Sequence, residues 1–132
     1  MSEIHKNRHA AFNLHVHLVF ITKHRKKVLG ELHHEFFSEC VAEVCKNFDA
    51  ELKECNGEAD HIHMLIQYPP TVQLSKLVNN LKSVTSRRMR GDFVDLRAAY
   101  AKPVLWSRSY FASSCGGAPL DIIKQYIQNQ QG

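Results

Sequence analysis

The sequence lacks the features that mark membrane-spanning, secreted and zinc-finger proteins. Its four cysteines, Cys40, Cys45, Cys55 and Cys115, form no CxxC pair, so a cysteine-based zinc site is not expected. No run of about 18 apolar residues is present, which argues against a transmembrane helix and a membrane partner. The polar stretch Met1 to Arg8 lacks the apolar segment of a secretory signal. We therefore expect a cytoplasmic protein whose cysteines are free thiols, most of them buried.

Internal repeats, low-complexity tracts and linkers are also missing. A chain of 132 residues with 44% apolar and 23% charged residues has the size and composition of one globular domain with its own core. We expect a single domain over residues 1–132, with a sheet core at about 10–115 and a C-terminal helix at about 118–131. The net charge of +4 is compatible with nucleic-acid binding but does not establish it.

The hydrophobic periodicity alternates between 2 and 3.6 residues along the chain. Strands are predicted at 11–22, 49–55, 61–68 and 104–113, with helices at 31–47, 73–90 and about 119–130. Asn56-Gly57 predicts the turn of a hairpin, and Gly116-Gly117 separates the last strand from the last helix. The first six elements follow the β-α-β-β-α-β order of a ferredoxin-like sheet. The fold class is therefore α+β: a ferredoxin-like or RRM-like antiparallel sheet with helices on one face, plus a C-terminal helix carrying Tyr126.

Two histidine pairs are candidates for metal binding. In His61-Ile62-His63 the strand alternation sends both imidazoles to the face opposite the isoleucine, where they can bind one divalent ion. His15 and His17 have the same spacing on the first strand. Spacing does not distinguish the two pairs, and each pair taken alone is more often simply the polar face of a strand.

A third candidate feature is the closing helix. Tyr126 and Gln130 are four residues apart, so they share one helix face. A tyrosine can attack phosphorus when a cation neutralises the phosphate. However, isoleucines at 122, 123 and 127 surround Tyr126, and on these residues alone a core tyrosine is the better interpretation.

Five segments together resemble a known family, the HUH single-strand transposases of prokaryotic insertion sequences, the smallest TnpA-type enzymes with one catalytic tyrosine. The segments are HLVFITKHRKKVL (17–29), EADHIH (58–63), LSKLVNNLKSVTSRRMR (74–90), WSRSYFASSCGG (106–117) and YIQNQ (126–130). Each segment is weak alone, but their order and spacing make the match specific. They cover nearly the whole chain.

The resemblance implies a role for each matching residue. The family's histidine–hydrophobic–histidine motif falls on His61 and His63 as metal ligands, its nucleophile on Tyr126, and its third ligand on Gln130. His17 is similar to a first-strand histidine of the family, and its role stays open. Mg²⁺ or Mn²⁺ suits such a ligand set because open positions remain for a phosphate oxygen. The implied intermediate is a 5′-phosphotyrosine, and no nucleotide cofactor is needed.

The resemblance also implies partners. The DNA is single-stranded, with hairpins at the element ends, and the enzyme is a homodimer whose active sites are shared between subunits. A basic surface for this DNA is predicted along the second helix and in the first turn, at Lys23, Arg25, Lys76, Asn80, Ser83, Arg87 and Arg90. For any single residue of this set, an ordinary solvated surface is the simpler interpretation. Trp106, Tyr110 and Phe111 are candidates for base stacking, although some of them must belong to the core.

Three alternatives remain open. A non-catalytic RRM-type module would need aromatic residues on its central strands, where this chain has histidines. A related HUH nickase acting on host repeats would share the chemistry and differ in substrate. A purely structural metal-binding dimer would have no DNA activity.

Overall fold

The computed structural model describes residues 5–6, 11–12, 14–114 and 127–129 of the chain. Within them the elements are β1 (His5–Lys6), β2 (Ala11–Phe12), β3 (His15–Thr22), η1 (Lys23–Arg25), α1 (Glu31–Lys46), β4 (Glu51–Gly57), β5 (His61–Gln67), α2 (Leu74–Asp92), α3 (Val94–Ala99) and β6 (Trp106–Ser114). Tyr126, Gln130 and Cys115, together with most of the predicted C-terminal helix, lie outside the described residues. Residues 127–129 are helical.

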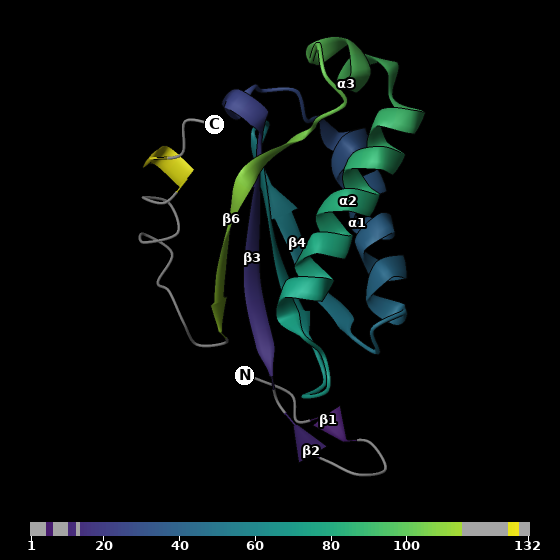
Figure 1. Ribbon diagram of the computed structural model, residues 1–132, viewed down its shortest axis with the longest axis vertical. Helices are drawn as coiled ribbons and strands as arrows, with labels where there is room; N and C mark the ends of the chain where they lie inside the picture. Colours follow the sequence, from purple (N-terminus) through teal and green to yellow (C-terminus); the bar gives the residue numbers. More distant parts are fainter. Residues whose placement is uncertain (1–4, 7–10, 13, 115–126, 130–132) are drawn as a thin grey trace.

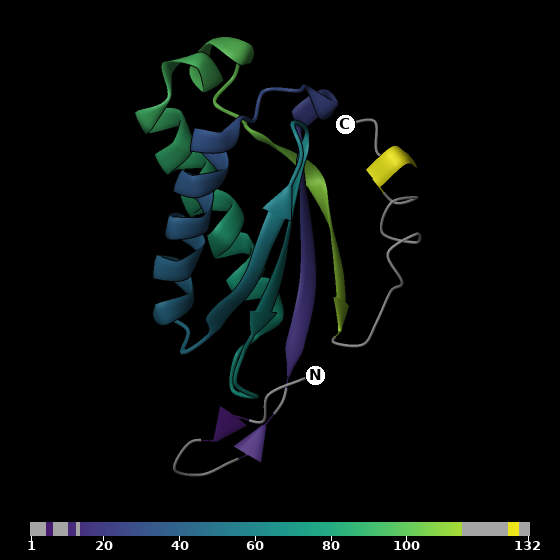
Figure 2. The same cartoon turned by 180° about the vertical axis from the view of Figure 1, so that it is seen from behind.

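The main sheet has four antiparallel strands in the order β4-β5-β3-β6. Helices α1 and α2 pack on one face of this sheet, and residues 127–129 lie on the other (Figure 1). The same arrangement is visible from behind (Figure 2). The predicted α+β sheet with helices on one face is therefore confirmed.

Alternation along the two central strands builds the hydrophobic core. Phe20 of β3 and Ile62 of β5 are fully buried under the helices, while the intervening residues face the opposite side. Phe37 and Trp106 lie 6.2 Å and 5.6 Å from Phe20 between ring centroids, in edge and tilted geometries. The indole N–H of Trp106 donates to Thr85 Oγ1 at 3.0 Å. Trp106 is thus one of the strand aromatics that belong to the core, as expected for some of the three, and its buried ring is not placed for base stacking.

The predicted Asn56-Gly57 turn was also wrong. Both residues belong to β4, where Asn56 pairs with His63 and Gly57 with Ile62. The chain reverses after them, and the Glu58 N–H donates to the His61 carbonyl at 2.9 Å. The turn signal failed because sheet pairing extends two residues further than the local sequence suggests.

Two other boundaries differ from the sequence prediction. The first long strand begins at His15, because Ala11–Phe12 pairs with β1 in a separate two-stranded sheet. The short helix α3 follows α2 and was not predicted. Across the described ranges, no helix is both long and apolar enough to cross a membrane.

Candidate functional site

His61 and His63 project together from β5 on the sheet face away from α1 and α2. Their strand partners on β3 are Ile21 and Val19, which face the same side. The two imidazole rings lie 6.4 Å apart between centroids, with an interplanar angle of 22°. The predicted parallel projection of this pair is therefore present in the structure.

Asp60 fixes the orientation of the first imidazole. Its Oδ1 lies 2.9 Å from His61 Nδ1. Because an ionised carboxylate only accepts hydrogen bonds, Nδ1 carries a proton, and in the neutral ring Nε2 then keeps its lone pair. Burial alone would raise the pKa of Asp60, but hydrogen bonds from His61 and Arg25 outweigh it and hold this pKa below its usual value. A carboxylate–histidine pair of this kind is the usual support of a metal-binding imidazole.

The surroundings of His63 favour its neutral form. Its burial lowers its pKa below the usual value, and the nearby charges of His61 and His17 lower it further. His17 therefore lies close enough to interact electrostatically with the pair, on the same face of β3. A neutral imidazole is the form that binds a metal ion.

The donor set fits an open divalent-metal site better than a closed structural one. Among the residues that the structure describes, no three His, Cys, Asp or Glu side chains cluster closely enough to hold a metal. Two imidazoles leave several positions free for further oxygen ligands.

Ile127 covers the strand that neighbours the histidine pair. Its buried side chain packs in a small cluster with Val19 and Ile21, and half-buried Phe111 borders this cluster. Because Val19 and Ile21 are the strand partners of His63 and His61, this packing sets residues 127–129 beside the strand that carries the histidine pair. The sequence neighbour on its N-terminal side is Tyr126.

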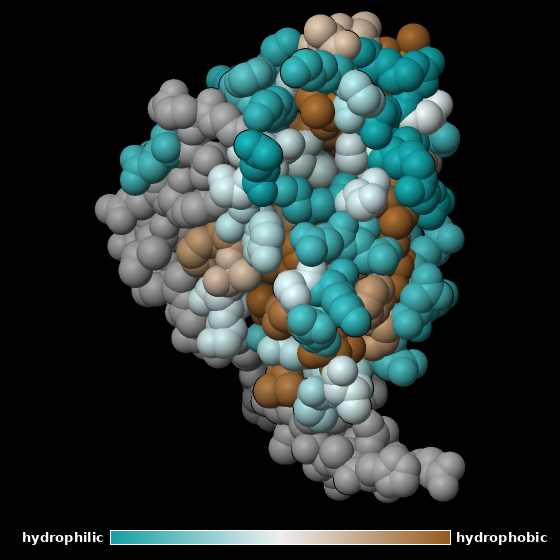
Figure 3. All heavy atoms as spheres, viewed as in Figure 1, coloured by the Kyte–Doolittle hydropathy of each residue, from teal (hydrophilic) through white to brown (hydrophobic). Residues whose placement is uncertain are grey.

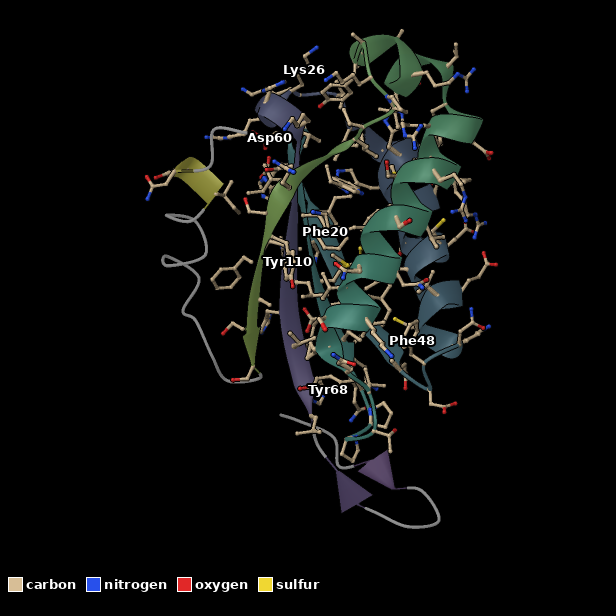
Figure 4. The ribbon with its side chains drawn as sticks, in the orientation of Figure 1. Phe20, Lys26, Phe48, Asp60, Tyr68 and Tyr110 are labelled. Carbon is tan, nitrogen blue, oxygen red and sulfur yellow. The ribbon has the colours of Figure 1, made fainter. Side chains whose placement is uncertain are left out.

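The basic turn after β3 reaches the same site. Figure 4 shows Asp60 near this end of the sheet, close to residues 127–129. Arg25 Nε and Nη2 donate to Asp60 Oδ2 at 3.3 Å and 3.2 Å. Arg25 Nη1 also donates to the Gln128 carbonyl at 3.2 Å. Arg25, predicted as a DNA-binding residue, thus contacts protein groups at the site in this structure.

The rest of the predicted basic surface lies elsewhere. Lys76, Asn80, Ser83 and Arg87 are exposed on α2, and Arg90 is half-buried with its Nε donating to Ser86 Oγ at 3.1 Å. Hydrophilic side chains line α2 in the space-filling view (Figure 3). Because α2 packs on the other face of the sheet, these residues are separated from His61 and His63 by the sheet itself. Lys23, half-buried in η1, lies at the same end of the sheet as Arg25.

Sequence reasoning gave no role to Asp60. An aspartate directly before the first histidine of the pair is the signal that was present in the sequence. Asp60 can act on the site because the turn before β5 brings one of its carboxylate oxygens to Arg25 and the other to His61.

Comparison with known proteins gives a consistent result. Residues 10–130 match the model of the family described as "Transposase IS200 like". The transposases for insertion sequence element IS200 of Salmonella typhimurium and Salmonella typhi are each 28% identical over 122 residues, which is 92% of this chain and 80% of each relative. The ISDra2 transposase TnpA of Deinococcus radiodurans is 26% identical over 129 residues, covering 97% of this chain and 91% of the relative.

Solved structures agree on the fold. A crystal structure of a Deinococcus radiodurans R1 protein assigned to the transposases superposes with a TM-score of 0.84 at 26% identity, covering 97% of this chain and 98% of the other. A REP-associated tyrosine transposase bound to a REP hairpin gives a TM-score of 0.57 at 11% identity, covering 96% of this chain and 68% of the other. At that identity the second likeness shows the fold alone.

Proposed function

Since the chain belongs to the family of IS200-like transposases, we propose that it cleaves and rejoins single-stranded DNA at the ends of an insertion sequence through a 5′-phosphotyrosine intermediate. Tyr126 is the nucleophile, and His61, His63 and Gln130 hold Mg²⁺ or Mn²⁺. One observation carries the proposal: the two imidazoles project in parallel from β5, and the Nδ1–H of the first is held by Asp60. This arrangement leaves the His61 Nε2 lone pair available to a metal ion.

The proposed chemistry needs few protein groups. The phenol of Tyr126 gives up its proton, and the phenolate oxygen attacks phosphorus. The bond between phosphorus and the 3′ oxygen of the preceding nucleotide breaks, and that oxygen takes up a proton to become a free 3′-hydroxyl. When bound, the divalent ion would neutralise charge on the phosphate and polarise it toward attack. Because the phosphotyrosine bond conserves the energy of the broken phosphodiester, a DNA 3′-hydroxyl can reverse the step without a nucleotide cofactor.

The substrate we propose is single-stranded DNA that folds into hairpins at the element ends. Membership of a family of insertion-sequence transposases supports DNA as the substrate class. The exposed residues of α2 provide an extended surface for phosphates. That surface is separated from the histidine pair by the sheet, so we propose that it holds the hairpin and not the scissile strand.

We further propose a homodimer in which Tyr126 completes the site of the partner subunit. Gly116-Gly117 precedes the C-terminal segment and gives it a point at which its path can change. In the structure Ile127 lies on its own chain's sheet, so sharing requires the segment to exchange between subunits and to make the same contacts on the partner's sheet. Mixing Tyr126→Phe and His61→Ala chains tests this directly. Restored activity in the mixed dimer supports sharing, whereas an inactive mixture with active wild-type dimers contradicts it.

The main experiment is a search for a covalent adduct. The full chain is incubated with Mg²⁺ or Mn²⁺ and labelled single-stranded hairpins from the flanks of its own gene, and denaturing gels are run. We expect an adduct that disappears in Tyr126→Phe and with a chelator. Tight binding without an adduct would favour the RRM-type binding module. An adduct formed only with host repeat hairpins would favour the nickase, and metal-dependent folding without DNA binding would favour a structural metal-binding dimer.

A further inference from the structure

Arg25 connects three parts of the chain that are remote in sequence. Its Nε and Nη2 donate to Asp60 Oδ2 at 3.3 Å and 3.2 Å, and its Nη1 donates to the Gln128 carbonyl at 3.2 Å. The second oxygen of the same carboxylate accepts from His61 Nδ1 at 2.9 Å. One guanidinium therefore joins the C-terminal segment to the group that orients a metal-binding histidine.

The backbone of the turn is shaped to present this side chain. His24 and Arg25 have φ angles of 60° and 53°, in the left-handed region that non-glycine residues rarely adopt. Such conformations persist when surrounding contacts fix them. Here Thr22 anchors the start of the turn, since its N–H and its hydroxyl both donate to the Asp60 carbonyl, at 3.0 Å and 3.2 Å. The hydroxyl also lies 2.7 Å from the Lys26 carbonyl.

The bond to Gln128 is well placed in the sequence. Gln128 is two residues after Tyr126 and two residues before Gln130. Ile127 packs on Val19 and Ile21 next to it, so the segment has one apolar and one polar attachment to the sheet. The apolar attachment fixes which face the segment covers, but apolar packing is non-directional. The hydrogen bond from Arg25 adds a directional constraint along the segment.

We propose that Arg25 is a positioning residue that sets the C-terminal segment relative to His61 through its simultaneous bonds to Asp60 and to the Gln128 carbonyl. The inference rests on the proposed function, because the segment carries the proposed nucleophile. These three hydrogen bonds give Arg25 a role within the protein that is separate from the DNA contact predicted for it. An ordinary surface ion pair would engage the carboxylate alone.

The test compares four full-length chains: wild type, Arg25→Gln, Asp60→Asn and a matched control, Arg88→Gln. Arg88 also forms an exposed ion pair, with Glu43 at 3.2 Å, on the helix layer. Amide hydrogen exchange at residues 127–129 is measured first, without metal or DNA. We expect exchange there to become at least about 10-fold faster in Arg25→Gln and to stay unchanged in Arg88→Gln.

Two further measurements separate positioning from metal binding. Mn²⁺ titration should give a dissociation constant about 10- to 100-fold weaker for Asp60→Asn, which loses the carboxylate behind His61. Arg25→Gln should weaken Mn²⁺ binding less than Asp60→Asn does. At saturating Mn²⁺, Arg25→Gln should form the covalent adduct at least about 10-fold more slowly than wild type. Arg25→Lys should recover only part of this rate, because one ammonium group cannot reproduce the three hydrogen bonds of the guanidinium.

The outcomes distinguish this inference from the proposed function. If Arg25→Gln exchanges the amide hydrogens of residues 127–129 at the same rate as wild type, the positioning role is overturned, whatever the activity of the variant. Faster exchange in Arg25→Gln, together with a wild-type chain that neither binds Mn²⁺ nor forms an adduct, would support the Arg25 link and overturn the proposed function. Unchanged adduct formation at saturating Mn²⁺ despite faster exchange would overturn the claim that the link serves catalysis.

Discussion

Ile127 packs against Val19 on the sheet face that carries His61 and His63. The contact joins residues 127–129 to β3, the strand beside the one that carries the two histidines. It is separate from the large core under α1 and α2, which lies on the opposite face. The two hydrophobic clusters therefore lie on opposite faces of the sheet, and substitutions can perturb them independently.

Ile127→Ala should impair DNA cleavage much more than it impairs folding. The substitution removes the centre of the small cluster and leaves the main core intact. We expect adduct formation to fall at least about 10-fold, while urea unfolding followed by Trp106 fluorescence changes little. Ile62→Ala, in the main core, is the matched control and should cost about 2–5 kcal/mol of unfolding free energy. Equal losses of stability in the two variants would show that the segment is integral to the core.

Gly57→Ala should damage the site through the backbone. A Cβ at this position would lie 2.3 Å from the His61 carbonyl oxygen and 2.8 Å from Ile62 Cα, so β4 and β5 could not keep their spacing. We expect a loss of about 1–3 kcal/mol in stability and weaker Mn²⁺ binding, because His61 shifts with its backbone.

Gly91→Ala is the control for Gly57→Ala, and we expect it to raise the stability of the protein instead of lowering it. An added Cβ at this exposed position in α2 meets nothing within 4 Å, and alanine favours the helix by up to about 1 kcal/mol. Thermal unfolding of both variants checks the pair. A Gly57→Ala chain as stable as wild type would contradict the predicted clash.

The stability of the metal-free protein should decrease as the pH falls below about 6.5, the usual value for histidine. The pKa of His63 is lowered in the folded state, so the unfolded chain takes up a proton there more readily. The contribution of His63 to the free energy of unfolding is therefore fully present above the pKa that it has in the unfolded chain, and it decreases below that pKa. Urea unfolding between pH 8 and pH 5 should show a smaller decline in His63→Gln than in wild type. The control is His24→Asn, at an exposed position, whose free energy of unfolding should fall with pH as it does in wild type. Equal slopes of unfolding free energy against pH in wild type and His63→Gln would refute the role given to His63.

Arg87→Ala should weaken DNA binding without altering metal affinity. Arg87 is exposed on α2, across the sheet from the histidines. If it contacts one phosphate, the slope of log K against log salt should become less steep by about 0.7–0.9. Salt titrations of hairpin binding and a Mn²⁺ titration measure the two effects. An unchanged salt slope would remove Arg87 from the DNA surface.

The sequence was sufficient to predict the architecture because alternation and helical periodicity are local signals. Val16, Leu18 and Phe20 alternate along the first predicted strand, and in the structure all three are buried in the core under the helices. The Asn56-Gly57 turn was misplaced because strand pairing with β5 overrode the local turn preference. Trp106 was ambiguous for a similar reason, since its burial depends on α1 and β3, which are distant in sequence.

The candidate site was predictable only in part. The projection of His61 and His63 followed from their spacing on a strand, but spacing could not choose between this pair and His15 with His17. The partners of Asp60 could not be predicted, because one is its sequence neighbour and the other lies 35 residues away in a turn with unusual φ angles. Tyr126 and Gln130 lie outside the described residues, so their roles stay predictions.

The alternation on β5 has an evolutionary consequence. Ile62, Met64 and Ile66 hold the core, and His61 and His63 between them contribute almost nothing to it. A mutation that removes either histidine therefore abolishes the proposed metal site and leaves a folded protein. Under the proposed function, a copy of the gene that has lost either histidine would encode an inactive protein that still folds and still competes with active copies for the same DNA ends.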